Sequence, residues 1–242
     1  MNYSLESSER ATLYRDYMLK VVQCWDDGVN DDIRLIEILR KHGAKASFNL
    51  NPATHGDLRQ GGFSDRWDKQ IDRLARSELS EVYEGFTIAN HSMSHPWPTR
   101  IALDDWRSEV VDARKILQDW FQQAILGFVY PFGDCDLATA DVVREAGHVY
   151  ARTTKNVTPC LPVADPMMFH ADCHFHNENF WDLYAKAKAS EAEVFYFWGH
   201  SYEICTEAEW AAFDEKIARI SADIEAEWVE LPDLFVGNLI ES

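Results

Sequence analysis

Short apolar runs alternate with amphipathic segments along most of the chain. The apolar runs have the length of buried strands, and the segments between them repeat apolar residues at the spacing of one helix face. The predicted strands cover 19–25, 45–50, 86–90, 125–130, 148–152, 168–175 and 194–198. The predicted helices cover 31–42, 67–76, 103–121, 137–146, 179–189 and a last helix that begins near 206. Strands that alternate with helices in this way predict a parallel sheet.

Signals at the helix ends support this assignment. Asn30 can cap the start of the helix at 31–42, and Gly43 can end it. The segment TEAE, from Thr206 to Glu209, matches a capping box and opens the last helix.

About seven strand–helix units predict an α/β protein of barrel or near-barrel form. The 242 residues fit one domain that spans 1–242, since no linker or internal repeat divides the chain. In barrels of this kind, functional side chains lie at the C-terminal ends of the strands. The polar clusters of this sequence follow the apolar runs directly, so we expect them at that end.

The negative charge of the chain limits the classes of molecule that it can bind. A formal net charge of -18 repels nucleic-acid phosphates and anionic lipid surfaces, and favours a neutral or cationic substrate. No apolar run is long enough for a transmembrane helix. Residues 1–18 lack the basic region and apolar stretch of a signal peptide, so we expect a cytoplasmic protein. Five widely spaced cysteines without a CxxC pair indicate reduced thiols.

Two adjacent acids, Asp26 and Asp27, directly follow the first predicted strand. Neighbouring carboxylates at a strand end suit a metal ligand beside a general base. An isolated acid pair is also typical of a helix N-cap with a loop acid, so the pair alone leaves both interpretations open.

Two histidines, His91 and His95, follow the strand at 86–90 in the segment NHSMSHP. Their i, i+4 spacing predicts that both imidazoles lie on one side of a helical turn, as in many zinc sites. Two solvent-exposed loop histidines would fit the same pattern. The acid pair expected at the same end of the sheet favours a metal site. One carboxylate and two imidazoles leave coordination positions open for water.

A third histidine, His200, follows the apolar run at 194–198 and is expected at the same end of the barrel. Histidine suits proton donation near neutral pH. The alternative is a histidine held by a hydrogen bond to a neighbour such as Glu203.

A further polar group lies in the segment DCHFH. Alternation along a strand predicts Asp172, His174 and His176 on one face. They would line the substrate side of the pocket or bind a second metal. A polar strand in the barrel interior or at its edge is the alternative, which fits His176 best.

Aromatic residues flank these motifs, and their flat apolar faces suit stacking against sugar rings. We expect three of them to line a carbohydrate pocket, namely Trp25, Tyr130 and Trp198. Most of the other aromatic residues are expected in the core.

The order of these motifs resembles the polysaccharide deacetylase family, the NodB-homology group of carbohydrate esterase family 4. The matching segments are CWDDGV, IANHSMSHP, FVYPFGD and FYFWGHS. They extend from Trp25 to His200, and IANHSMSHP is the most specific of them. The resemblance implies a deformed (β/α)7-type barrel.

The resemblance also implies roles for individual residues. The ligands of a divalent metal, commonly zinc in such enzymes, would be Asp27, His91 and His95. Asp26 would be the general base toward the attacking water, and His200 the general acid toward the leaving group. A backbone N–H near Tyr130 would complete the oxyanion site.

The sequence departs from the family pattern at three places. The third motif usually begins with an arginine that orients the base, a place held here by Phe128 or Val129. The opening motif usually reads TFDDGP, and the last usually has Asp after the histidine, where this chain has Ser201. The missing arginine removes a charge that would depress the pKa of the base. Arg152 is our candidate to supply that charge from a neighbouring strand. A surface or structural arginine is the alternative.

These patterns together predict a metal-dependent hydrolase that removes an acetyl or other acyl group from a carbohydrate. Two alternatives stay open. One is hydrolysis of a non-peptide C–N bond in a small amide or cyclic ureide on the same fold. The other is a catalytically inactive sugar-binding relative, which the retention of both aspartates and all three histidines disfavours. The sugar, the choice between amide and ester, the identity of the metal and the oligomeric state stay open as well.

Overall fold

The computed structural model describes residues 18–159, 161–190 and 192–236 of the chain. Residues 1–17, on which the expectation of a cytoplasmic protein rests, lie outside the described residues, as does Cys160. That expectation therefore stays a prediction. Within the described ranges, none of the helices combines the length and the apolar character needed to cross a bilayer.

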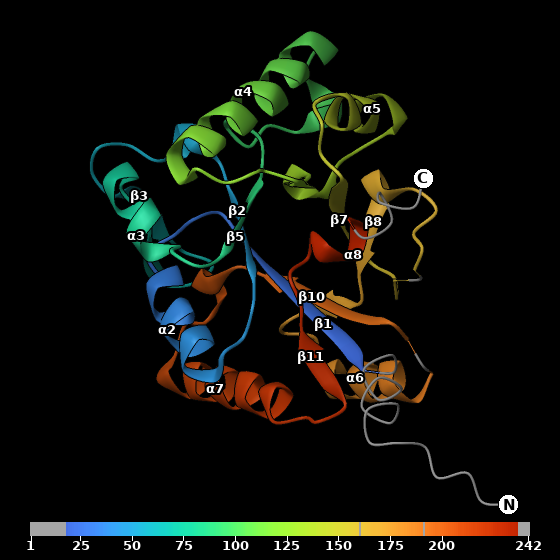
Figure 1. The fold of residues 1–242 in the computed structure, drawn as a ribbon. Helices are drawn as coiled ribbons and strands as arrows, with labels where there is room; N and C mark the ends of the chain where they lie inside the picture. The colour runs from blue at the N-terminus through green and yellow to red at the C-terminus, as the bar shows by residue number, and fades with distance from the viewer. Residues whose placement is uncertain (1–17, 160, 191, 237–242) are drawn as a thin grey trace, which may run out of the picture.

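One parallel sheet curves into a nearly closed barrel (Figure 1). Its strands are β1 (Leu19–Asp26), β2 (Ser47–Leu50), β5 (Thr87–Asn90), β6 (Gly127–Val129), β7 (Tyr150–Asn156), β8 (Phe169–Ala171), β9 (Cys173–His174), β10 (Val194–Gly199) and β11 (Ala226–Trp228). They follow the order β8-β7-β6-β5-β2-β1-β10-β9, with β11 paired to β1. The predicted (β/α) barrel is confirmed.

The barrel comes close to closing at Asp172. The two outer strands of the sheet order, β8 and β9, follow one another in the chain with only this residue between them. The backbone N–H of Asp172 donates to Tyr196 O, and its carboxylate Oδ2 accepts from Tyr196 N at 2.9 Å. Asp172 thus ties the junction of β8 and β9 to β10.

Helices surround the sheet, with α4 and α5 together on one side and α2 beside α7 on another (Figure 1). The helices are α2 (Asp32–His42), α3 (Leu79–Val82), α4 (Leu103–Phe121), α5 (Leu137–Glu145), α6 (Phe180–Ala189), α7 (Glu207–Ser221) and α8 (Asp233–Val236). Short 3-10 turns are η1 (Pro52–Thr54), η2 (Arg76–Glu78), η3 (Pro98–Arg100), η4 (Pro131–Gly133), η5 (Pro166–Met168) and η6 (Ser201–Glu203). Most of the predicted helices are confirmed within one or two residues.

The helices form where apolar residues recur on one face. In α4 the buried residues Trp106, Val110, Ala113 and Leu117 follow the helical repeat, which explains why this helix matches its predicted bounds. The capping box at Thr206 is confirmed at the start of α7. At the start of α2, however, Asp31 and not Asn30 is the N-cap, and Asn30 Oδ1 accepts a hydrogen bond from Asp72 N.

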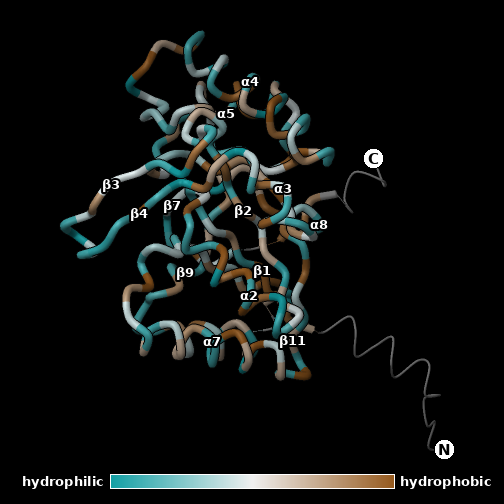
Figure 2. The backbone as a smooth tube through the Cα atoms, turned by 90° about the vertical axis from the view of Figure 1, so that its left-hand side faces the viewer, coloured by the Kyte–Doolittle hydropathy of each residue, from teal (hydrophilic) through white to brown (hydrophobic). Residues whose placement is uncertain are grey.

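The segment 60–76 differs from its prediction. We expected a helix at 67–76, but the chain forms an antiparallel hairpin of β3 (Gln60–Ser64) and β4 (Lys69–Arg73). Its second strand is held by backbone bonds to the loop after β1, which include Asn30 N to Asp72 O. Tertiary pairing therefore overrides the local helical pattern. Figure 2 shows the hairpin as a mostly hydrophilic arm that projects from the body of the protein.

Candidate active site

The chain turns sharply after β1 and places two carboxylates at its C-terminal end. Asp26 is the last residue of the strand, and Asp27 and Gly28 both have left-handed backbone, with φ of 89° and 65°. A Cβ on Gly28 would lie 2.6 Å from the ring of His55, so only glycine fits there. Both carboxylates are buried, and a strained aspartate at such a place is typical of a functional site.

Arg152 reaches Asp26 from β7. Its Nη2 lies 2.5 Å from Asp26 Oδ2, while Asn49 Nδ2 donates to Oδ1 at 2.6 Å. Arg152 is 0% exposed and Asp26 is 2% exposed, so this is a fully buried ion pair. Burial raises the pKa of Asp26, but the Arg152 guanidinium and nearby histidines outweigh it and hold the pKa below its usual value. The charge missing from the third motif therefore stands beside Asp26.

The loop after β5 carries His91 and His95, but it is not the helical turn that we predicted. Ser92 and His95 have left-handed backbone, with φ of 66° and 63°. Asn51 holds the loop, because its Nδ2 donates to the backbone carbonyls of His91 and Ser92. The two imidazoles meet because of this irregular loop, with ring centroids 4.7 Å apart.

Asp27, His91 and His95 form a group that we call the Asp27 cluster. One ligand atom from each lies within 4.8 Å of the others. His91 Nδ1 is 2.8 Å from Val129 O, which leaves its other ring nitrogen for a ligand. Burial lowers the pKa of His91 to about 4, so this imidazole is neutral at pH 7.

The Oδ1 atom of the Asp27 carboxylate is available to bind a divalent cation. Among the residues that the structure describes, this buried Oδ1 accepts no hydrogen bond, and a buried acceptor without a hydrogen bond is costly. One carboxylate with two neutral imidazoles is a donor set that binds zinc and its neighbours in the transition series. The residues present therefore fit a metal ion.

Arg73 of β4 also contacts Asp27, which the sequence prediction missed. Its Nη1 donates to the backbone carbonyl of Asp27 and lies 3.1 Å from Oδ1 without hydrogen-bond geometry. Burial raises the pKa of Asp27, but Arg73 and three nearby histidines hold it well below its usual range. Because the hairpin was taken for a helix, no sequence signal placed Arg73 at this site.

His200 follows β10 and faces both carboxylates. Its Nε2 lies 3.9 Å from Asp26 Oδ2 and 4.0 Å from Asp27 Oδ2. Burial lowers the pKa of His200, but Glu203 and the two aspartates outweigh this effect, and the pKa is raised. His200 therefore stays protonated to a higher pH than an ordinary histidine.

A second group, which we call the Glu203 cluster, consists of His174, His200 and Glu203. Glu203 Oε2 lies 2.7 Å from His174 Nε2, and Oε1 lies 3.3 Å from His200 Nδ1. His174 Nδ1 accepts the backbone N–H of His176 at 3.3 Å, so the proton of this ring is on Nε2, facing Glu203. The distances would also suit a metal, but the hydrogen bonds already use the ligand atom of His174.

Several residues predicted to contact substrate lie elsewhere. Trp25 is 0% exposed and packs on Phe175 and Phe213, because its side chain points from β1 to the outer helices. Tyr130 is also 0% exposed, its hydroxyl donates to Met167 O, and its N–H donates to Arg152 O. Neither side chain lines a pocket, and the N–H of Tyr130 is not free for an oxyanion.

The structure also corrects the prediction for Asp172. We expected it to line the pocket together with His174, but it lies between β8 and β9 and is buried. Its carboxylate accepts from the Tyr196 backbone, because this irregular position breaks the alternation of the strand. The same break leaves His174 facing Glu203.

Three aromatic residues lie near the two clusters: Trp198 beside His174 and His200, Phe132 beside His95, and Trp97 stacked on Phe132. Trp198 is half-buried, with the Arg152 guanidinium 4.4 Å from its ring centroid. Phe132 is 46% exposed and its ring is 4.5 Å from that of His95. Trp97 is 36% exposed and stacks on Phe132 at 4.0 Å. Phe132 also has left-handed backbone, with φ of 59°, which is rare for an aromatic residue.

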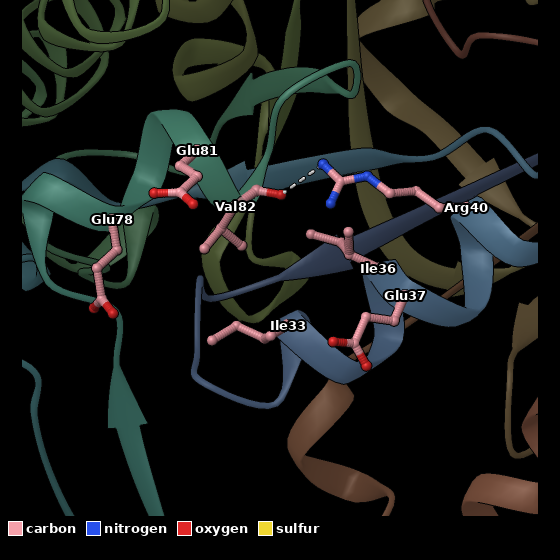
Figure 3. Close-up of a pocket in the computed structure, with 7 residues that line it drawn as sticks. All are labelled: Ile33, Ile36, Glu37, Arg40, Glu78, Glu81 and Val82. Atoms are coloured by element: carbon pink, nitrogen blue, oxygen red, sulfur yellow. Dashed lines mark hydrogen bonds between the residues drawn. The ribbon is translucent and has the colours of Figure 1, made fainter.

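A groove of about 310 Å³ lies on the outside of the barrel between α2 and α3 (Figure 3). Ile33 and Ile36 line one side and Val82 the other, and Arg40 donates to the Val82 carbonyl. None of the residues of the Asp27 or Glu203 clusters lines this groove, so it is separate from the candidate active site.

Comparisons with known proteins agree with this architecture. A family profile described as polysaccharide deacetylase matches residues 19–151. The solved structure of the Bc1960 peptidoglycan N-acetylglucosamine deacetylase has a TM-score of 0.58 at 16% identity, covering 90% of this chain and 88% of that one. A mutant of the peptidoglycan deacetylase PdaC from Bacillus subtilis has a TM-score of 0.54 at 16% identity, covering 90% of this chain and 90% of that one.

A third similar structure is BA3943, a family 4 pseudoenzyme from Bacillus anthracis. Its TM-score is 0.57 at 14% identity, covering 90% of this chain and 65% of that one. No curated protein matches the chain. At these identities the structural likeness shows the fold, and the family profile covers more than half of the chain. The chain belongs to the polysaccharide deacetylase family.

Proposed function

We propose that this protein is a metal-dependent deacetylase that hydrolyses an acetyl or other acyl group from a carbohydrate. The observation that carries the proposal is the convergence of three kinds of group at one end of the barrel. Asp26 is an ionised carboxylate, the Asp27 cluster fits a metal, and His200 Nε2 lies about 4 Å from both aspartates. Base, metal ligands and acid are the groups that such a hydrolysis requires.

Asp27, His91 and His95 would hold the metal. When bound, a divalent ion there would act as a Lewis acid on the acyl group and on an attacking water. The strained turn at Asp27 and the bond of His91 to Val129 O would hold these two ligands in position without a bound ion. Zinc is our expectation for the ion, since it prefers such a mixed set of donors.

Asp26 would accept the proton of the attacking water. Its pKa is lowered, so it is ionised at neutral pH. Arg152 and Asn49 each bond one of its oxygens, which fixes the orientation of the carboxylate. The arginine from β7 thus takes the positioning role of the arginine that the third motif lacks.

His200 would donate a proton to the leaving amine or alkoxide. Its raised pKa keeps the imidazole protonated to a higher pH than an ordinary histidine, and Glu203 faces the ring from the other side. The exposed pair of Phe132 and Trp97 would contact the sugar next to His95.

Acetate release from N-acetylated and O-acetylated sugars tests the proposal. We expect the zinc-loaded protein to release acetate, and we expect Asp26→Asn to retain its metal but lose turnover by roughly a hundredfold or more. Activity only on a small amide or cyclic ureide would favour the other hydrolase reaction. A protein that binds sugars with equal affinity with and without Asp26→Asn, and releases no acetate, would be an inactive relative like BA3943.

A further inference from the structure

A buried carboxylate outside the proposed catalytic set joins the start of α2 to the turn that carries His200. Asp32, the first residue of α2, is 0% exposed. Its Oδ2 accepts the hydroxyl of Tyr83 at 2.6 Å, and its Oδ1 accepts the hydroxyl of Ser201 at 2.5 Å. A buried carboxyl group is costly unless it is hydrogen-bonded, so these two hydroxyls make its burial possible.

Ser201 is the residue directly after His200 and begins η6. It is itself 0% exposed, and its carbonyl accepts the N–H of Ile204 within the turn. His200 O accepts the N–H of Glu203 in the same turn. A shift of Ser201 would therefore move both the imidazole of His200 and the carboxylate that orients it.

The hydrogen bond between Asp32 and Ser201 also connects to Asp27, because Asp32 begins the helix that follows the Asp27 loop. The loop that connects Asp27 to α2 is short, and Asp32 N donates to Val29 O within it. The Asp32–Ser201 bond thus ties the element that follows Asp27 to the turn that carries His200. The gap of about 4 Å between His200 Nε2 and the two aspartates lies between the two segments that this bond joins.

We propose that Asp32 is a positioning residue, which fixes His200 relative to Asp26 and Asp27 through the Ser201 hydroxyl. The proposal rests on the proposed function for the role of His200 as an acid. Tyr83 provides a matched control, because it is the residue after α3, bonds the same carboxylate and makes no hydrogen bond to the turn at 201–203 within the described residues.

The test compares Ser201→Ala with Tyr83→Phe, each of which removes one hydroxyl from Asp32. We expect Ser201→Ala to lower kcat roughly ten- to a hundredfold, with KM within about twofold and metal content unchanged. The reason is that the substitution would change the orientation of His200 and not the binding of substrate or metal. Tyr83→Phe should keep the wild-type kcat although it loses a similar hydrogen bond. If Ser201→Ala does not fold, Asp32→Asn takes its place with the same expectation. Equal kcat values for the two variants would overturn the proposal.

Hydrogen exchange gives a readout that needs no activity. Ser201→Ala should speed amide exchange in 200–205, whereas Tyr83→Phe should speed it in 79–83. Unchanged exchange in 200–205 would overturn the proposal even in an active enzyme. A wild type without deacetylase activity, combined with the expected exchange pattern, would reject the proposed function and keep the structural link.

Discussion

Two groups of histidines and carboxylates lie at the same end of the barrel, and they differ in how their ligand atoms are used. In the Asp27 cluster, the carboxylate Oδ1 is buried and accepts no hydrogen bond within the described part of the chain. In the Glu203 cluster, the carboxylate lies within reach of two imidazoles, and His174 uses both of its ring nitrogens. The first group is arranged to take a cation, whereas the second is arranged to hold a histidine in place.

The comparison shows that residue types and distances alone do not define a metal site. Both clusters contain two imidazoles and a carboxylate, and both satisfy the same distance limit. What separates them is the hydrogen-bond partner of each atom, because a ring nitrogen that carries a proton cannot bind a metal. The variants below should therefore affect the two clusters in different ways.

The largest effect, on the free energy of unfolding, is expected from a change that breaks the ion pair of Asp26 and Arg152. Arg152→Gln leaves the buried Asp26 carboxylate without its cation, so the free energy of unfolding should fall by about 3–5 kcal/mol. Denaturant unfolding measures the change. The double variant with Asp26→Asn should recover much of the loss, since it removes the unpaired charge. A loss below about 1 kcal/mol for Arg152→Gln alone would contradict a buried ion pair.

The next effect concerns Asp32, whose carboxyl supports the turn of the Glu203 cluster. Burial raises its pKa to about 7, so the folded protein keeps a proton that the unfolded chain, with a pKa of 3.8, has released. Folding thus binds a proton between these values, and stability should fall as pH rises from about 4 to 7. One pKa unit corresponds to about 1.4 kcal/mol, so the fall is on the order of a few kcal/mol.

Urea unfolding of wild type and Asp32→Asn across that pH range isolates this contribution. The variant should lose less stability as the pH rises, because the amide does not titrate. Parallel curves for the two proteins would mean that Asp32 has an ordinary pKa in the folded state.

A smaller effect should come from Glu203→Gln. The change removes the negative charge that raises the pKa of His200, so kcat at neutral pH should fall roughly ten- to a hundredfold. Metal content should stay the same, which separates this cluster from the Asp27 cluster. Glu207→Gln is the control, since Glu207 is exposed and pairs with Arg34 away from the site. Loss of metal from Glu203→Gln would show that the two clusters are not distinct.

The smallest effect concerns the exposed aromatic pair. Phe132→Ala should raise KM for an acetylated sugar a fewfold, or about 1 kcal/mol, because it removes an apolar face beside His95. Steady-state kinetics measures the change. Trp25→Phe should lower stability and leave KM unchanged, since Trp25 is in the core. A KM effect from Trp25 and none from Phe132 would restore the sequence-based assignment.

Most of the fold could be predicted because its strands and helices have strong local patterns. The run at 19–25 is mostly apolar since β1 lies in the middle of the sheet, paired with β2, β10 and β11. The hairpin at 60–73 could not be predicted in the same way. Its second strand depends on contacts with the loop after β1, which are distant in sequence.

The residues of the site could be predicted where they follow the ends of strands. They could not be predicted where the direction of the side chain decides whether a residue faces the site. Asp26, Asp27 and His200 come directly after buried runs, so their place followed from the barrel. Trp25 was misassigned because neighbouring residues on a strand face opposite sides, and Asp26 already faces the site. The partner of Asp26 was proposed from the sequence as Arg152, but only the structure shows the contact.

Metal content tests the central claim most directly. Wild type, His91→Gln and His174→Gln would each be reconstituted with zinc, dialysed and measured for metal per chain. We predict about one tightly bound ion in wild type and in His174→Gln, and none in His91→Gln, because the buried Oδ1 of Asp27 accepts no hydrogen bond within the described residues, whereas the ring nitrogen of His174 that faces Glu203 carries a proton. Metal that is lost in His174→Gln and kept in His91→Gln, or no metal in wild type, would contradict the account.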